Sequence, residues 1–313
     1  MNVKLKSTLV KYRSIIGLIL FSLIISLLND RFLTLSNISN VLRQTSINSI
    51  IAAGMTFVIL TGGIDLSIGS TLAFTGATSA FMIFSGVHPL LAVFFSLLLG
   101  LGLGMLNGVI ISKGRLQPFI VTLATMTILR GATMVFTNGK PISTGYDAYG
   151  ELFNKIGEGY IFNIPNPVLI MIAIFSFGYF ILKNTTFGRY VYALGGNEDA
   201  TELSGINVDR IKIFVYGING LLAALAGIII TSRLSSAQPT AGSGYELDAI
   251  AAVVLGGTSL AGGVGSILGT IVGALIIGIL NNALNLMNVS SYYQLLLKGL
   301  VILIAVLLDR KQK

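Results

Sequence analysis

Long apolar segments separated by short polar connectors recur along the whole chain. Most of them have the roughly 17 to 25 residues that a helix needs to cross a bilayer. Because unsatisfied backbone groups are costly in lipid, helices are the expected structure. The pattern predicts an all-α, polytopic transmembrane helical bundle with about eight to ten membrane segments. The apolar segments cover residues 15–29, 46–62, 66–86, 89–112, 118–137, 166–183, 213–231, 245–257, 266–284 and 291–308.

Two breaks in this pattern contain paired glycines. Gly62 and Gly63 interrupt one apolar run, so we expect a turn at the membrane boundary that places Asp65 at a helix N-terminus. A comparable break at residues 256–259 suggests a diverged internal duplication. Segment 245–257 is too short to cross the bilayer comfortably, which favours a half-helix or a re-entrant piece lining a cavity.

Lysine and arginine accumulate in alternate connectors, as the positive-inside rule requires of a membrane protein. If the N-terminus is cytoplasmic, the inside connectors collect most of the basic residues, so both termini are expected in the cytoplasm. The first apolar segment has no small-residue cleavage site after it, which favours an uncleaved span over a signal peptide. The predicted inside residues are Lys4, Lys6, Lys11, Arg13, Lys113, Arg115, Lys183, Arg189, Arg210, Lys212, Arg310, Lys311 and Lys313, and the predicted outside residues are Arg31, Arg43, Lys140, Lys155 and Arg233.

The composition supports a membrane protein and removes most enzyme chemistry. The 313 residues are 54% hydrophobic and 10% charged, whereas soluble domains carry about 25% charged residues. The chain has no cysteine and a single histidine, His88, which excludes disulfides, iron–sulfur clusters and zinc sites built on thiolates or several histidines. We therefore predict no metal, no cofactor and no enzymatic activity. The net charge of +8 does not indicate nucleic-acid binding, because the basic residues lie between apolar segments.

The most charged connector, residues 184–212, is a candidate coupling segment. The chain has no G-x-x-x-x-G-K-[ST] loop, so if transport is powered by ATP, a separate ATPase must dock on an inside connector. A short helix is expected there, with an asparagine N-cap, acidic residues in its early turns and a glycine stop. A capped surface helix joining two spans would explain the same residues. The candidate coupling residues are Asn197, Glu198, Asp199, Ala200, Glu202 and Gly205.

Two long strings in the chain are distinctive: G-M-T-F-V-I-L-T-G-G-I-D-L-S-I-G-S at residues 54–70 and R-L-S-S-A-Q-P-T-A-G-S-G-Y-E-L-D-A-I-A-A-V-V-L-G-G-T-S-L-A-G-G at residues 233–263. Together with the coupling segment, they resemble the ribose permease subunits of bacterial ATP-binding-cassette (ABC) sugar importers. Related permeases carry a docking signature E-A-A-x-x-x-G. Here Asp199 replaces an alanine of that signature, and Gly205 comes one residue late.

This resemblance is nearly full-length and implies a single transmembrane permease domain over residues 1–313. It also implies a bacterial cytoplasmic membrane location, a homodimeric pore, a cytoplasmic ABC ATPase subunit and a periplasmic or lipid-anchored sugar-binding protein. The expected function is translocation of a monosaccharide, most readily ribose, delivered by the binding protein and powered by the ATPase. Membrane lipid is the remaining expected partner.

Polar side chains in or beside the apolar segments are candidates for a sugar path. A monosaccharide offers hydroxyls that exchange hydrogen bonds and needs no countercharge. Hydrogen bonds between helices would explain the same residues equally well. The ionisable residues Arg130, Glu246, Asp248 and Lys298, which also lie in or beside spans, are interpreted as structural. The candidate path residues are Gln44, Asn48, Asp65, Asn107, Asn219, Asn281 and Asn282.

Two other classes of function remain as alternatives. An ion-coupled secondary sugar transporter would need membrane-embedded carboxylates or broken helices that bind Na⁺ or H⁺. The scarcity of acids within the apolar segments argues against this class. A membrane enzyme would need a catalytic constellation, and His88 beside Pro89 offers only an isolated base.

Overall fold

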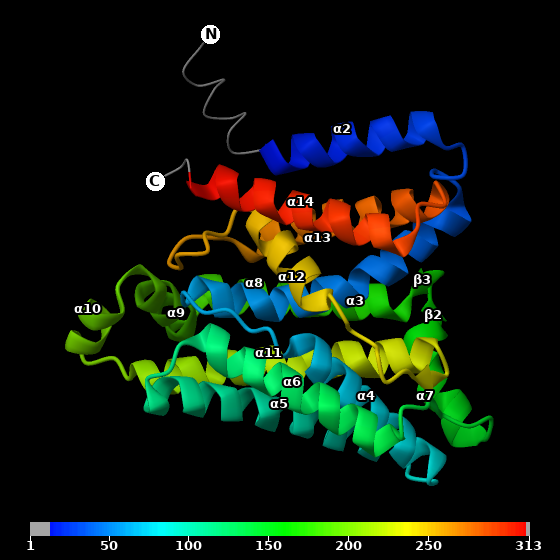
Figure 1. Ribbon diagram of the computed structural model, residues 1–313, viewed down its shortest axis with the longest axis horizontal. Coiled ribbons are helices and arrows are strands. Elements are labelled where there is room, and N and C mark those ends of the chain that lie inside the picture. The colour runs from blue at the N-terminus through cyan, green and yellow to red at the C-terminus, as the bar shows by residue number, and fades with distance from the viewer. Residues whose placement is uncertain (1–12, 311–313) are drawn as a thin grey trace.

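The computed structural model describes residues 13–310, and long helices packed side by side make up most of it (Figure 1). Shorter helices and two small antiparallel strand pairs, β1 with β4 and β2 with β3, lie at the ends and in the interior. The helices are α2 (Arg13–Leu28), α3 (Leu35–Leu60), α4 (Ile68–Phe84), α5 (Pro89–Gly114), α6 (Pro118–Thr137), α7 (Ala148–Glu158), α8 (Asn166–Asn184), α9 (Thr186–Gly196), α10 (Glu198–Leu203), α11 (Val208–Arg233), α12 (Tyr245–Leu255), α13 (Ile267–Leu286) and α14 (Ser291–Arg310). The strands are β1 (Ile142–Ser143), β2 (Tyr160–Ile161), β3 (Ile164–Pro165) and β4 (Ser236–Ala237).

Within the described residues, α5, α6, α8, α11 and α13 are each long and apolar enough to cross a membrane. Their outward faces carry exposed large hydrophobic side chains, including Phe94 on α5, Ile128 on α6 and Phe177 on α8. Such faces are stable in lipid and costly in water. The predicted all-α, polytopic membrane fold is therefore confirmed.

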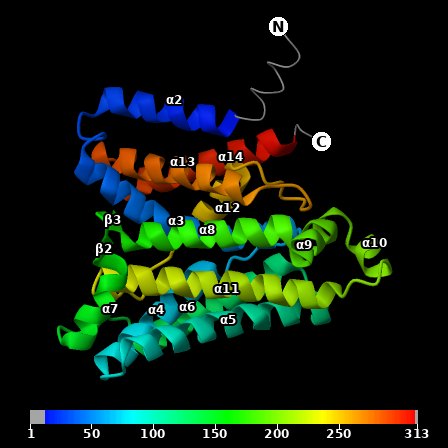
Figure 2. The same ribbon diagram turned by 180° about the vertical axis from the view of Figure 1, so that it is seen from behind.

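The connectors gather at two opposite ends of the bundle, as Figures 1 and 2 show from the two sides. One end, called here the inner end, holds α9, α10, the α5–α6 connector, the start of α2 and the finish of α14. The other, called the outer end, holds α7, the β2–β3 hairpin and the α2–α3 connector. This matches the grouping of basic connectors predicted from the sequence. The sidedness in the cell stays a prediction, and the terminal lysines Lys4, Lys6, Lys11, Lys311 and Lys313 lie outside the described residues.

Two crossings of the bundle are broken into an irregular half and a helical half. After α3 the chain turns at Gly62, where φ is +78°, and it stays irregular until α4 begins at Ile68. After α11, residues 234–244 return into the bundle before the eleven-residue helix α12, as the half-helix interpretation predicts. Both half-helices start in the interior, where a Cβ on Gly69 would overlap the Gly242 carbonyl oxygen.

This break corrects the expected position of Asp65. A turn at the membrane boundary with Asp65 at the N-terminus of the next helix would leave this side chain near that boundary, but it is 1% exposed and lies inside the bundle, three residues before α4 begins. The glycine turn does occur where α3 ends, at the inner end. Because α4 starts only at Ile68, the intervening residues carry Asp65 inward.

Helices α5 and α11 pack closely against each other and form the most extensive helix pair in the described part of the chain. Glycines face each other along it. A Cβ on Gly104 would overlap the carbonyl oxygen of Tyr216, and a Cβ on Gly220 would overlap that of Gly100. Small residues let helix backbones approach and gain dispersion contacts, which replace the hydrophobic effect as the packing force inside a membrane.

Candidate functional site

The inner end carries a short, doubly capped helical element. Thr185 caps α9 by accepting a hydrogen bond from the Gly188 amide at 3.2 Å. Asn197 caps α10, its Oδ1 accepting from the Ala200 amide at 2.9 Å. Gly205 follows with φ +82°, a conformation that glycine adopts without steric cost. The predicted N-cap and glycine stop are confirmed.

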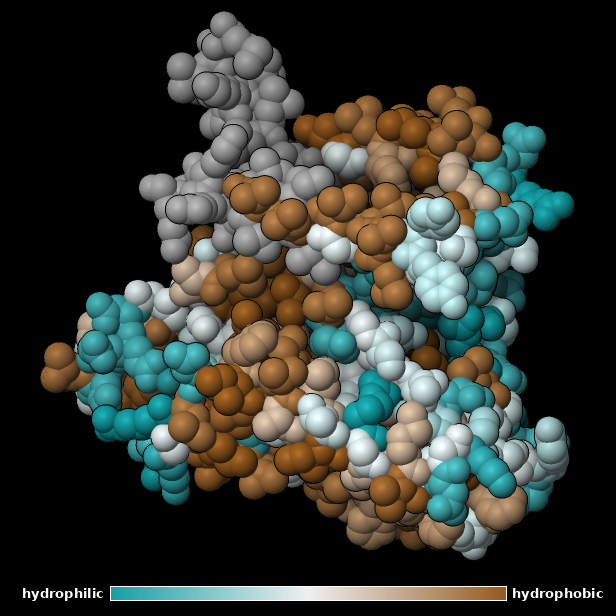
Figure 3. Space-filling model, viewed as in Figure 1, coloured by the Kyte–Doolittle hydropathy of each residue, from teal (hydrophilic) through white to brown (hydrophobic). Residues whose placement is uncertain are grey.

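A polar cavity of about 620 Å³ lies between this element and the α5–α6 connector. One wall comes from Lys113, Arg115 and Gln117, and the other from the α10 acids and the start of α11. Figure 3 shows hydrophilic residues gathered over α9 and α10 at this end. Among them Leu203, the last residue of α10, is an apolar side chain left 89% exposed.

The acidic residues of α10 differ in their contacts. Glu198 forms an ion pair of 2.6 Å with Lys212 on α11, which anchors the start of α10. The Asp199 and Glu202 side chains are exposed and line the same cavity. The free acidic surface of α10 therefore comes from Asp199 and Glu202.

Helix α9 connects α10 to the broken crossing. Its Val191 and Leu194 are buried, and Gly195 lies so close to α3 that a Cβ would overlap the Leu60 carbonyl oxygen. The Gly263 amide, from the α12–α13 connector, donates to that same oxygen at 2.9 Å. The α9 helix, the end of α3 and the α12–α13 connector thus meet at one backbone junction.

A buried polar network surrounds Asp65. Its carboxylate accepts hydrogen bonds from the Ser67 amide at 2.9 Å and hydroxyl at 2.6 Å, and from Asn219 Nδ2 at 2.9 Å. Asn107 Nδ2 donates to the Ser67 hydroxyl at 3.0 Å, and Thr125 donates to Asn107 Oδ1 at 2.6 Å. The network ties the irregular segment before α4 to α5, α6 and α11. No basic group pairs with Asp65 among the described residues.

A second polar cavity, of about 360 Å³, lies in the outer half of the bundle and is called here the outer cavity. Five helices contribute to its walls: α3, α11, α12, α13 and α14. Five of the fourteen lining residues carry a carboxamide. The lining residues are Gln44, Thr45, Ile47, Asn48, Ile230, Arg233, Leu234, Tyr245, Asp248, Gly278, Asn281, Asn285, Gln294 and Lys298.

Three of the ionisable residues near the spans, Arg130, Asp248 and Lys298, are held by partners. Lys298 on α14 donates to Asp248 Oδ2 at 2.9 Å, and Asn281 donates to the same oxygen at 3.5 Å. Arg130 on α6 donates to the carbonyls of Pro239 and Ala241 at 3.2 and 2.9 Å. It therefore fastens the irregular segment 234–244 to α6. Their interpretation as structural residues agrees with these contacts.

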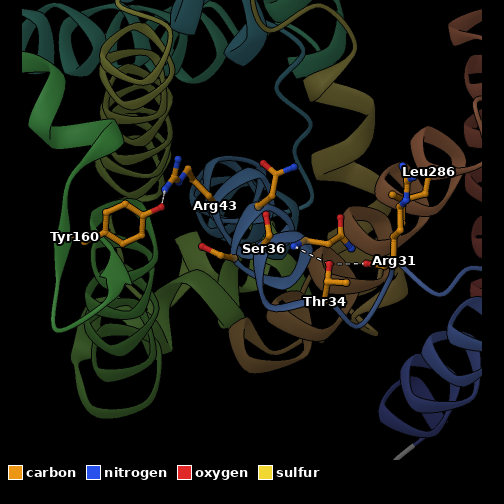
Figure 4. Close-up of a pocket in the computed structure, with 9 residues that line it drawn as sticks. Arg31, Thr34, Ser36, Arg43, Tyr160 and Leu286 are labelled. Atoms are coloured by element: carbon orange, nitrogen blue, oxygen red, sulfur yellow. Dashed lines mark hydrogen bonds between the residues drawn. The ribbon is translucent and has the colours of Figure 1, made fainter.

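The outer end has a polar depression of about 670 Å³ bounded by Arg31 and Arg43 (Figure 4). The Arg43 guanidinium contacts Tyr160 of the β2–β3 hairpin, both through the phenol oxygen and over the ring. Arg31 lies across the depression beside Leu286 (Figure 4). No salt bridge to either arginine occurs in the described part of the chain. The depression, called here the outer mouth, is therefore electropositive.

The predicted path residues fall into three groups. Gln44, Asn48 and Asn281 come together in the outer cavity. Asp65, Asn107 and Asn219 lie in the buried network, each at most 1% exposed. Asn282 exchanges hydrogen bonds with Asn37 at 2.9 and 3.0 Å and lines none of the three cavities described above.

The sequence interpretation missed Thr45, Tyr245 and Gln294 as cavity residues. An available signal was helical spacing on α3, since Gln44, Thr45 and Asn48 lie within one turn and so share a face. Tyr245 and Gln294 had no comparable signal, because their positions depend on how α12 and α14 pack against α3.

Comparisons with known proteins identify close relatives over almost the entire chain. The ribose import permease protein RbsC of Haemophilus influenzae is 58% identical over 308 residues, covering 98% of this chain and 95% of that protein. RbsC of Bacillus subtilis is 57% identical over 297 residues, covering 95% and 92%. The xylose transport system permease protein XylH of Escherichia coli K12 is 37% identical, covering 90% and 86%. No solved structure matches the chain.

A family-level comparison agrees with these relatives. Residues 37–306 match the family described as the permease component of branched-chain amino acid transport systems. The match extends from α3 into α14 and so includes both broken crossings, α9 and α10. The chain therefore belongs to this family of transport-system permease components.

Proposed function

We propose that this chain is the membrane-spanning permease subunit of a bacterial ABC importer that moves ribose across the inner membrane. The observation that carries the proposal is α10, a capped helix at the inner end that presents Leu203 to solvent. The substrate follows from 57–58% identity to permeases named for ribose, against 37% to one named for xylose. The chain itself is not the catalyst, and ATP is hydrolysed on the partner subunit.

The ATPase docks on α10. An exposed leucine beside exposed acidic groups provides an apolar anchor with a polar rim, the composition of a protein interface. Asp199 and Glu202 supply the rim, while Leu203 supplies the anchor. Asn197, Ala200 and Gly205 shape the helix and its two ends, and Glu198 fastens it to α11 through Lys212.

Movement at α10 reaches the membrane interior through α9. Because Gly195 leaves no gap against Leu60, a displacement of α9 pushes on the end of α3 and on the α12–α13 connector. The irregular residues after α3 lead directly to Asp65. Close-packed elements shift between discrete arrangements and do not deform continuously, so this junction converts docking into a change of the path.

A sugar-binding protein docks at the outer mouth. Arg31 and Arg43 make this surface electropositive, so the complementary surface on the partner is acidic. Such complementarity raises association rates and fixes the orientation of the partners. The binding protein then releases its sugar over the outer cavity, which shares helix α3 with the mouth.

The working unit is a homodimer. Irregular backbone cannot face lipid and is tolerated where it is buried in protein or lines a water-filled cavity. Thr240 and Ser243, in segment 234–244, are nevertheless exposed in the single chain. On the face of the molecule seen in Figure 3, hydrophilic and intermediate residues, coloured teal and near white, interrupt the hydrophobic surface beside α12. A second copy facing it would enclose an aqueous path.

Gln44, Asn48 and Asn281 form the polar wall of the sugar path in the outer half of the membrane. Asp65, Asn107, Asn219 and Asn282 have other partners in this conformation. The first three of these four residues hold the broken crossing to its neighbours. Their part in translocation is therefore indirect, through the position of that segment.

Reconstitution into proteoliposomes tests the function. The purified chain, its ATPase subunit and its sugar-binding protein are expected to accumulate radiolabelled ribose only when ATP is present on the ATPase side. Omitting any one component should remove accumulation. Accumulation by the chain alone under an ion gradient, without ATP, would instead establish the secondary-transporter alternative.

A further inference from the structure

The outer cavity has the construction of a ligand site, in addition to being a stretch of the path. All its lining residues except Leu234 lie on helices, among them Gln44 on α3, Asp248 on α12, Asn281 on α13 and Lys298 on α14. Sites built on packed helices hold their side chains more firmly than sites on loops. The volume of about 360 Å³ lies at the lower end of the range of about 300–1,000 Å³ typical of ligand pockets, so the site suits a small molecule.

The lining chemistry favours an uncharged ligand rich in hydroxyls. Each carboxamide of Gln44, Asn48 and Asn281 offers both donors and an acceptor, and a hydroxyl also uses both. The opposite charges of Asp248 and Lys298 cancel, because Lys298 Nζ lies 2.9 Å from Asp248 Oδ2. Arg233 adds hydrogen-bond donors to the wall formed by α11, together with a positive charge that no salt bridge among the described residues neutralises.

Two polar atoms of cavity-lining residues lack a protein partner. The Thr45 hydroxyl and the Asn281 carboxamide oxygen are buried and make no hydrogen bond with the described residues. A buried polar atom without a partner costs free energy, so such atoms in a folded protein call for an explanation. A ligand in the adjoining cavity would supply the missing partners.

We propose that the outer cavity binds one uncharged, pentose-sized polyhydroxylated molecule in each copy of the chain, with Thr45 and Asn281 among its hydrogen-bonding partners. The inference rests on the proposed function and adds to it a defined sugar-binding site within each protomer, called here the station. Sugar leaving the binding protein would pause there, next to the start of α12. The permease would then contribute its own selectivity for hydroxyl number and charge.

Binding of radiolabelled D-ribose to the full-length chain in lipid nanodiscs tests this station, with Thr45→Val as the main variant. Valine has nearly the same shape and removes a hydroxyl that has no protein partner, so the fold should be retained. Affinity is expected to fall about five-fold, the effect of one hydrogen bond. Asn281→Leu should lower it by at least about ten-fold, because both a donor and an acceptor are lost.

Ser49→Ala is the matched control. Ser49 lies one turn further along α3, and its buried hydroxyl also has no partner within the described part of the chain, but it does not line the cavity. Ribose affinity should be unchanged in this variant. Equal effects of Ser49→Ala and Thr45→Val, or no saturable binding by the unaltered chain, would overturn the proposed site. Stronger competition by ribose 5-phosphate than by unlabelled ribose would overturn its assignment to an uncharged ligand.

The outcome separates this inference from the function on which it rests. If the complete reconstituted complex imports ribose with ATP while the cavity variants bind ribose normally, only the station is wrong. If the complex imports no ribose at all, the assigned substrate is wrong, whatever the nanodisc measurements give.

Discussion

Replacing Gly104 by leucine is expected to prevent the folded permease from accumulating in the membrane. Gly104 lies where α5 crosses α11, and even a Cβ there would overlap the carbonyl oxygen of Tyr216. Overpacking a core usually costs about 1–3 kcal/mol. The cost here should reach at least the upper end, about 3 kcal/mol, because the obstacle is backbone that no rotamer change can move. Thermal unfolding of the detergent-purified protein, together with its yield in membranes, measures the effect.

Gly102→Leu provides the matched control on the same helix. Gly102 is exposed, and nothing lies within 4 Å of the Cβ that would be added. The leucine would therefore face lipid, where it is stable. Normal yield and an unchanged unfolding temperature are expected. If Gly104→Leu behaved like Gly102→Leu, the α5–α11 crossing would not be as close as described.

Leu203→Asp is expected to abolish ATP-driven uptake while leaving the protein folded and inserted. Leu203 is 89% exposed, so the change removes no packing within the chain. It does place a charge at the centre of the proposed ATPase contact, where truncation of a buried anchor costs more than about 2 kcal/mol. Ribose uptake by reconstituted complexes should fall at least about ten-fold, and the stimulation of ATPase activity by ribose-loaded binding protein should disappear.

Leu203→Met should retain uptake, because methionine keeps an apolar side chain of similar size. Glu198 is a poorer choice for this test, since its ion pair with Lys212 means that charge reversal also disturbs the base of α10. Full uptake by Leu203→Asp would remove α10 from the ATPase interface. Loss of membrane insertion would show that Leu203 has a structural role.

The helical architecture was readable from the sequence because lipid leaves few alternatives. Each apolar run had to become a helix, and glycine or proline marks many of its ends, as at Pro89 and Pro118. The short helix α12 was also predictable, because the apolar run at residues 245–257 is too short to cross the bilayer comfortably. The interior position of Asp65 was not, because a Gly-Gly turn marks where α3 ends but does not indicate where the next helix begins.

The candidate sites could also be predicted from the sequence only in part. The capped α10 element was predictable, since an asparagine cap and a glycine stop are local signals. The outer cavity was only partly predictable. The carboxamides of Gln44, Asn48 and Asn281 were recognisable as polar residues in or beside apolar segments. These three residues line one cavity, while Asn107 and Asn219 lie elsewhere, in the buried network around Asp65. This separation depends on which helices touch, and the spacing of apolar residues along the sequence does not show that.

A photo-crosslinking measurement tests the central claim most directly, namely that a partner ATPase drives this permease through α10. A benzoylphenylalanine at position 203 in the active, assembled complex should crosslink to the ATPase subunit on illumination. The same group at position 162, where Phe162 is 95% exposed at the outer end, should give no ATPase crosslink. Crosslinking of the ATPase from position 162, or none from position 203 in a complex that still imports ribose, would contradict the account.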